Sequence, residues 1–132
     1  MNLNFKISEL IHSDIAIQNN INNMPDINSL DNLLELVFYC LQPIRDLIKK
    51  PMIITSGFRN QQVNFLAGGA FNSQHKEGKA ADFIIKGMTP KEIIEIIKKS
   101  DIEYDQLLNE YDKWVHISFN RGKNRMDIKH IK

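Results

Sequence analysis

The chain has 132 residues, of which 17 are Lys or Arg and 16 are Asp or Glu, giving a formal net charge of +1. This length is typical of one domain, and 42% hydrophobic with 25% charged residues indicates a globular protein with a real core. The near-zero charge argues against nucleic-acid binding and against strong attraction to an anionic surface. The single cysteine, Cys40, excludes an intramolecular disulfide and a multi-cysteine zinc site, so a metal would need His, Asp or Glu ligands.

The sequence shows neither a membrane span nor a secretion signal. No stretch approaches the roughly 18–20 consecutive apolar residues of a span, and the N-terminal residues lack a basic region followed by an apolar run. We therefore expect synthesis in the cytoplasm without a signal peptide. Because the sequence contains no repeat or linker, we expect a single domain over residues 1–132, and we expect it to be a monomer.

One long helix dominates the first half of the chain. Residues 7–12 are only weakly periodic and predict a surface segment, followed by an Asn-rich loop. From Ser29 to Ile48, apolar residues recur every three or four positions, which predicts a helix capped at Ser29. Pro43 falls inside this run and predicts a kink, and Pro51 predicts the end of the helix.

The second half predicts short elements separated by turns. Apolar and β-branched runs predict strands, and Thr89 followed by Pro90 predicts the start of a helix. In chain order we expect a strand at 52–55, a short helix through 63–66, a nonperiodic loop at 72–78, a strand at 80–85, a helix at 90–99, and strands at 104–108 and 114–119 joined by a hairpin turn at 109–113. This pattern predicts the α+β class, with helices packed on a small, mostly antiparallel sheet.

Two histidines and an aspartate fall on or beside the predicted strands. His75 lies in the nonperiodic loop, and Asp82 follows in a strand, with Gly78 between them to let the chain turn. His116 lies in the apolar run of the last strand, where burial is costly unless its ring nitrogens are occupied. Such residues suit Zn²⁺ with a fourth position left for water. Spacing leaves open the alternative that separate hydrogen bonds satisfy each residue.

The motif S-x-H-x-x-G-x-A-x-D, here residues 73–82, is followed by Trp114-Val115-His116. This pattern resembles the zinc D-Ala-D-Ala carboxypeptidase and L-alanyl-D-glutamate endopeptidase superfamily, which shares its fold with the vancomycin-resistance dipeptidases and the hedgehog signalling domain. The resemblance extends through ITSGFRN at 54–60, Asn64 with Gly68-Gly69, and YDQLLNEY at 104–111, as in phage and bacterial murein hydrolases. It implies a hedgehog/DD-carboxypeptidase-like fold with zinc held by His75, Asp82 and His116.

The resemblance also implies a general base that takes a proton from a zinc-activated water. Many members of the superfamily place this base three residues before the last histidine ligand, where this chain has Lys113. In the phage-like and hedgehog branches a glutamate six residues before that ligand takes its place, and Glu110 matches it. Glu110 is therefore the expected base and Asp112 the substitute, while an exposed carboxylate in the hairpin turn is the alternative interpretation of Glu110.

Other polar residues receive roles by the same resemblance. Arg59 matches an arginine that binds a substrate carboxylate or stabilises the oxyanion, and an ion pair is its alternative role. Further substrate contacts are expected from Ser73, Gln74 and Trp114. Ordinary packing or surface roles are expected for Cys40, His12 and His130.

The resemblance implies a zinc metallopeptidase that hydrolyses an amide bond in bacterial peptidoglycan stem peptides, of the D-Ala-D-Ala carboxypeptidase or L-Ala-D-Glu endopeptidase type. The alternatives are a catalytically inactive zinc-containing cell-wall or protein-binding module and a structural protein, such as a phage tail component, without metal. Such an enzyme is expected to reach the wall by assisted release or as part of a phage particle. Loops at 65–74 and 120–127 are expected to set which bond is cleaved.

Overall fold

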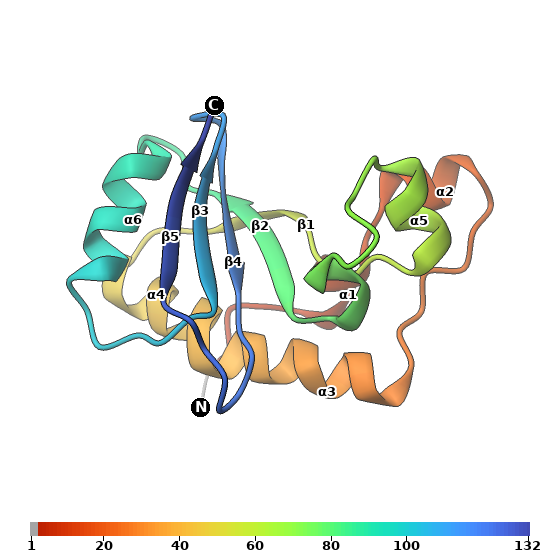
Figure 1. Cartoon of the computed structure of the whole chain (residues 1–132), viewed down its shortest axis with the longest axis horizontal. Coiled ribbons are helices and arrows are strands. Elements are labelled where there is room, and N and C mark those ends of the chain that lie inside the picture. The colour runs from red at the N-terminus through yellow and green to blue at the C-terminus, as the bar shows by residue number, and fades with distance from the viewer. Residues whose placement is uncertain (1–2) are drawn as a thin grey trace.

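The computed structural model describes residues 3–132 as one five-stranded sheet with helices around it (Figure 1). The strand order is β1-β2-β4-β3-β5, and neighbouring strands are antiparallel except for the parallel pair β3 and β5. The strands are β1 (Ile53–Ser56), β2 (Ala80–Ile84), β3 (Gln106–Glu110), β4 (Trp114–Ser118) and β5 (Asp127–Ile131). The predicted α+β class with a mostly antiparallel sheet is confirmed.

The helices gather at the two ends of the sheet and beneath it (Figure 1). α6 packs against β3 and β4, whereas α1, α2 and α5 lie at the opposite end, beyond β1. Their bounds are α1 (Ile7–Ile11), α2 (Asp14–Gln18), α3 (Ile27–Leu36), α4 (Gln42–Ile48), α5 (Gln61–Leu66) and α6 (Pro90–Lys98). None of the helices in the described residues combines the length and apolarity that crossing a membrane requires.

The long predicted helix is present, but it is built of three pieces. α3 begins two residues before Ser29, because the Asp26 side chain accepts a hydrogen bond from the Ser29 N–H at 2.7 Å and caps the helix. The prediction of Ser29 as the cap is therefore wrong. A π-helical turn at Val37–Leu41 precedes Pro43, which lies in the first turn of α4. Because proline has no N–H to donate, the wider turn lets the helix continue to its end before Pro51.

The two ends of the chain differ from the sequence predictions. Residues 7–11 form α1 rather than a surface segment, because Leu10 is buried in the core at 1% exposure. α2 and β5 were not predicted. Both are short, and β5 is an edge strand of mostly exposed and partly exposed residues, so its sequence lacks the alternation of a half-buried strand.

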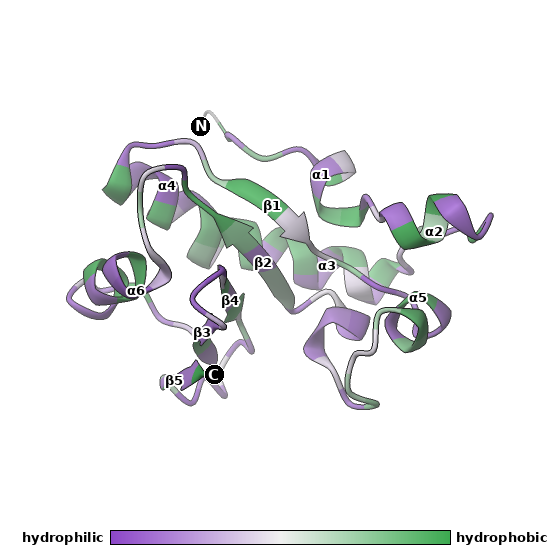
Figure 2. Ribbon diagram, turned by 90° about the horizontal axis from the view of Figure 1, so that it is seen from above, coloured by the Kyte–Doolittle hydropathy of each residue, from purple (hydrophilic) through white to green (hydrophobic). Residues whose placement is uncertain are grey.

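The core lies between the sheet and the long helix, and Figure 2 shows apolar stretches along the elements that meet there. Alternate strand residues point into it, among them Ala81, Phe83, Leu107, Val115 and Ile117. Cys40 is fully buried in the same core, and this burial raises the pKa of its thiol, which agrees with a packing role. The other residues of β2 and β4 therefore face the opposite side of the sheet.

Gly78 joins the short 3₁₀ turn at Gln74–Glu77 to β2. Its φ of 73° is left-handed, and a Cβ at this position would lie 2.3 Å from the carbonyl oxygen of Ser29. We expect Gly78→Ala to lower the free energy of unfolding by about 2–4 kcal/mol, from backbone strain and overpacking together. Urea denaturation of the metal-free protein measures this loss.

Gly87 offers a matched control for this substitution. Its φ is 84°, but no heavy atom lies within 4 Å of a Cβ built there. Gly87→Ala should therefore cost only the backbone strain, about 1–2 kcal/mol. Equal losses in the two variants would show that the close approach of Gly78 to the long helix is unimportant.

Candidate metal centre

Three potential metal ligands converge on the face of the sheet opposite the core. They are His75 in the 3₁₀ turn, Asp82 in β2 and His116 in β4, and all three are buried. Their ligand atoms lie within 4.8 Å of one another. Asp82 Oδ1 is 2.9 Å from His116 Nδ1 and 3.3 Å from His75 Nε2. Within residues 3–132 this is the only group of three such residues arranged to hold a metal ion.

The strand register explains how two of these residues meet. Asp82 and His116 are directly opposite each other in the antiparallel pair of β2 and β4. Facing residues of such a pair have neighbouring Cβ atoms, so a carboxylate and an imidazole at these positions can share a ligand. His75 reaches the same point from outside the sheet, and the Arg59 N–H donates to its carbonyl oxygen at 3.0 Å.

The donor chemistry of this group fits zinc. His75 Nδ1 lies 2.7 Å from the carbonyl oxygen of Gly57, which can only accept, so in the neutral ring Nδ1 carries the proton and the lone pair of Nε2, on the Asp82 side, is left for a metal ion. Burial by itself would raise the pKa of Asp82, but the hydrogen bond from His116 and the neighbouring His75 ring outweigh it and hold this pKa well below its ordinary value. An ionised carboxylate beside two imidazoles is a common zinc ligand set.

Glu110 lies beside this group. It is the last residue of β3, opposite Trp114, and its Oε1 is 3.6 Å from His116 Nδ1. Its side chain is 21% exposed, and burial, followed by the nearby charge of Asp82, raises its pKa. The hairpin turn is shorter than predicted, because β3 extends to Glu110. Glu110 is therefore not an exposed turn residue.

Asp112 has a different position. It is exposed in the hairpin turn, where its Oδ1 accepts a hydrogen bond from Asn109 Nδ2 at 2.8 Å. Its own N–H donates to Asn109 Oδ1 at 3.0 Å. Both contacts stabilise the left-handed backbone of Tyr111 and Asp112, whose φ angles are 61° and 56°. Asp112 thus stabilises the turn and does not lie beside His75, Asp82 and His116, which together form the candidate metal centre.

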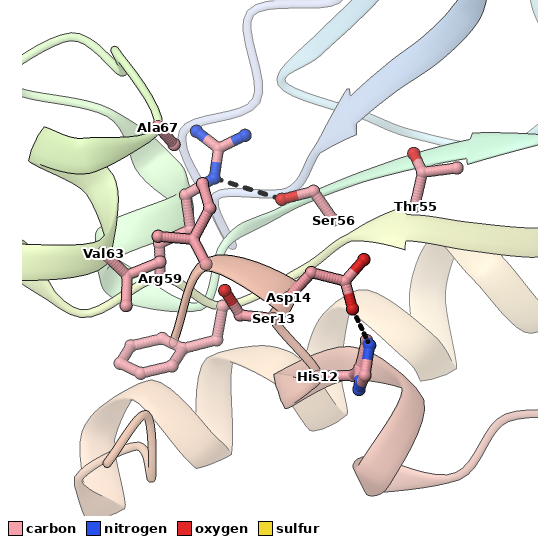
Figure 3. Close-up of a pocket in the computed structure, with 10 residues that line it drawn as sticks. His12, Ser13, Asp14, Thr55, Ser56, Arg59, Val63 and Ala67 are labelled. Atoms are coloured by element: carbon pink, nitrogen blue, oxygen red, sulfur yellow. Dashed lines mark hydrogen bonds and ion pairs between the residues drawn. The ribbon is translucent and has the colours of Figure 1, made fainter. Parts of the chain in front are cut away.

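Arg59 follows β1 and is held by three side chains. Its Nε donates to Ser56 Oγ at 3.1 Å, as Figure 3 shows, and its Nη1 to Asn64 Oδ1 at 3.4 Å. Nη2 is 3.7 Å from Asp82 Oδ2. Asn64 also donates to the carbonyl oxygen of Ala70 at 2.9 Å, so it fixes the guanidinium and the loop after α5 together. Only the motif resemblance had pointed to Asn64.

Arg59 separates the metal centre from a cavity of about 290 Å³, drawn in Figure 3. His12 lines the far part of this cavity, exposed and 2.9 Å from Asp14. His130 is exposed on β5, with its Nδ1 3.2 Å from Asn109 Nδ2. Neither histidine contributes to the metal centre, in agreement with the predicted surface roles.

The candidate metal centre opens into a central cavity of about 360 Å³. Its walls include the three potential ligands and Arg59, together with Ser73, Glu110, Trp114, the unpredicted Tyr111 and the loop at 67–70. Tyr111 packs edge-on against Trp114, with ring centroids 5.7 Å apart. Gln74, although predicted to contact substrate beside Ser73, lines a neighbouring cavity and donates to Asp105 Oδ2 at 2.8 Å.

Asp105 links two segments in the wall of this neighbouring cavity, one containing Gln74 and the other Arg125. Its carboxylate accepts from Arg125 Nε at 2.9 Å, from Arg125 Nη2 at 3.0 Å and from Gln74. The Arg125 side-chain hydrogen bonds, partly opposed by burial, lower the pKa of Asp105 to about 2 from its ordinary 3.8. The Asp105 side chain is 1% exposed and that of Arg125 57% exposed.

The ion pair of Asp105 and Arg125 should make the stability of the fold depend on pH. Because the folded-state pKa is lowered, the stabilisation is complete above about pH 4 and is lost as the pH falls through about 2. We expect the Asp105→Asn substitution to lower the free energy of unfolding more at pH 6 than at pH 2. The difference between the two losses should be about 1 kcal/mol, after allowing for solvent screening of Arg125. Urea unfolding of the metal-free proteins measures both values. A difference independent of pH would contradict the ion pair.

Comparison with known proteins identifies the family of this chain. No curated protein matches the sequence. A family model described as Peptidase M15 matches residues 3–118, which contain the three potential ligands, Arg59 and Glu110. The match covers most of the chain and ends with β4, before β5. The chain therefore belongs to the peptidase M15 family of zinc-dependent metallopeptidases.

Proposed function

We propose that the protein hydrolyses an amide bond in bacterial peptidoglycan stem peptides, as a zinc carboxypeptidase or endopeptidase. The observation that carries this proposal is the meeting of His75, Asp82 and His116 beside the Glu110 carboxylate, within an open cavity. His75, Asp82 and His116 would hold the ion. When bound, zinc supplies a Lewis acid that polarises the scissile carbonyl and makes water acidic enough to deprotonate near neutral pH.

Glu110 is suited to moving the proton in this reaction. A water oxygen attacks the carbonyl carbon while the Glu110 carboxylate accepts the water proton, and the same carboxyl group then donates it to the leaving amine as the C–N bond breaks. Its position at the end of a strand, packed near His116, limits the directions that the carboxylate can take. Burial further favours its protonated form between the two transfers.

Arg59 and the cavity walls would position the substrate. The guanidinium is fixed by Ser56 and Asn64 before any ligand arrives, so it can bind a substrate carboxylate or the developing oxyanion at little entropic cost. Ser73 and Trp114 line the same cavity and are proposed to contact the peptide.

Digestion of purified peptidoglycan tests the proposal. The zinc-loaded protein should release new amino termini, the chelator-treated protein should not, and mass spectrometry of the fragments should identify the cleaved bond. The proposal fails if the zinc-loaded protein binds peptidoglycan without producing new amino termini. That outcome would instead support an inactive zinc-containing binding module, for which the Lys113 at the common base position is the argument.

A further inference from the structure

A second cavity, of about 480 Å³, adjoins the metal centre. It shares Ala70, Ser73 and His116 with the central cavity, so the two cavities adjoin at these residues. Its other walls come from Asn72 and Gln74, from the beginning of β3 and from the loop between β4 and β5. This loop lies outside the residues matched by the family model, so family membership assigns it no role.

The second cavity has an excess of positive charge. Its titratable groups besides His116 are Asp105, Lys123 and Arg125. Asp105 and Arg125 neutralise each other through their paired hydrogen bonds. Lys123 is exposed, and none of the salt bridges among residues 3–132 involves it. One ammonium group is thus left available to a ligand.

The remaining walls are mostly polar. Asn72, Ser73 and Gln106 bring amide and hydroxyl groups that can pair with peptide N–H and C=O groups, and the apolar contribution is limited to Ala70 and Leu108. A carboxylate next to peptide bonds matches this combination better than an apolar side chain does. Stem peptides carry carboxylates at more than one residue.

We infer that the second cavity is a substrate subsite in which Lys123 binds a stem-peptide carboxylate other than any bound by Arg59. This inference rests on the proposed function. Arg59 lines the central cavity and Lys123 lines the second cavity, with His116 in the wall of both. A peptide that extends across His116 therefore reaches both cations, and Lys123 discriminates between substrates by the presence of this second carboxylate.

Binding of defined peptides tests the subsite without turnover. Zinc-loaded Glu110→Gln protein is titrated calorimetrically with a synthetic stem peptide and with forms in which each carboxylate is amidated singly. Adding Lys123→Ala should weaken binding of the unmodified peptide about three- to tenfold. For one amidated form this loss should nearly vanish, because the partner of Lys123 is already absent. Lys98→Ala, which removes the same charge from an exposed helix end, is the control.

Each other outcome overturns the subsite. An equal loss for all peptides would indicate a general charge effect, while no loss, or no binding of any peptide, would leave Lys123 without a carboxylate partner. The result is separable from the proposed function, since peptidoglycan digestion by wild type is measured independently. Lys123-dependent binding without hydrolysis overturns the proposed function alone, and hydrolysis with Lys123-independent binding overturns the subsite alone.

Discussion

Glu110→Gln is expected to lower kcat by about 10²–10⁴-fold while zinc content stays at the wild-type level. The amide has nearly the shape of the carboxylate, so packing at the end of β3 should be retained. It cannot accept the proton of the attacking water, however, so the step assigned to Glu110 is lost. Initial rates on a soluble stem peptide and zinc analysis of the same sample measure both effects.

Asp112→Asn is the matched control for that substitution. It makes the same chemical change two residues away, on a side chain that contacts Asn109 rather than the metal centre. We expect its activity to remain within about threefold of wild type, because surface changes of this kind rarely shift energies by more than about 0.5 kcal/mol. If Asp112→Asn lost most of its activity while Glu110→Gln stayed active, Asp112 rather than Glu110 would be the general base.

His116→Ala is expected to abolish stoichiometric zinc binding and, with it, hydrolysis. His116 is a potential ligand itself, so its removal should cost more than the 10–100-fold in affinity typical of losing a group that merely orients a ligand. It also removes the 2.9 Å hydrogen bond to Asp82 and leaves that buried carboxylate less well paired. Zinc content after dialysis against a weak chelator measures the change.

Thermal unfolding gives a second measurement on the same variant. A ligand present at about 1,000 times its Kd stabilises the folded state by about 4 kcal/mol, so zinc should raise the Tm of wild type but not that of His116→Ala. His130→Ala removes an exposed histidine and should behave as wild type in both measurements. Retention of stoichiometric zinc by His116→Ala would remove this residue from the ligand set.

The sequence predicted most of the sheet, because its inner strands carry strong local signals. The runs around Phe83 and Ile117 are apolar and β-branched, and two of the strands are close enough in the chain to form a hairpin. β5 carries no such signal, since its residues are partly or fully exposed and its parallel pairing with β3 depends on the finished sheet. The cap at Asp26 has no clear sequence signal, because the apolar periodicity begins only after Ser29.

The site was predicted less completely, for a geometrical reason. The motif singled out His75, Asp82 and His116, but the pairing of Asp82 with His116 joins residues 34 positions apart and depends on strand register. The different orientations of Glu110 and Asp112 depend on two left-handed residues in the turn and on the Asn109 hydrogen bonds. Neither feature is encoded in spacing, so only the family resemblance ranked Glu110 ahead of Asp112 as the expected base.

Stepwise return of zinc to the chelated protein tests the central claim most directly. Zinc content and the release of new amino termini from peptidoglycan are measured on the same samples. If His75, Asp82 and His116 form a catalytic zinc site, hydrolysis should rise in proportion to bound zinc and reach its maximum at one ion per chain. Hydrolysis that is independent of zinc content, or full zinc binding without any hydrolysis, would contradict the account.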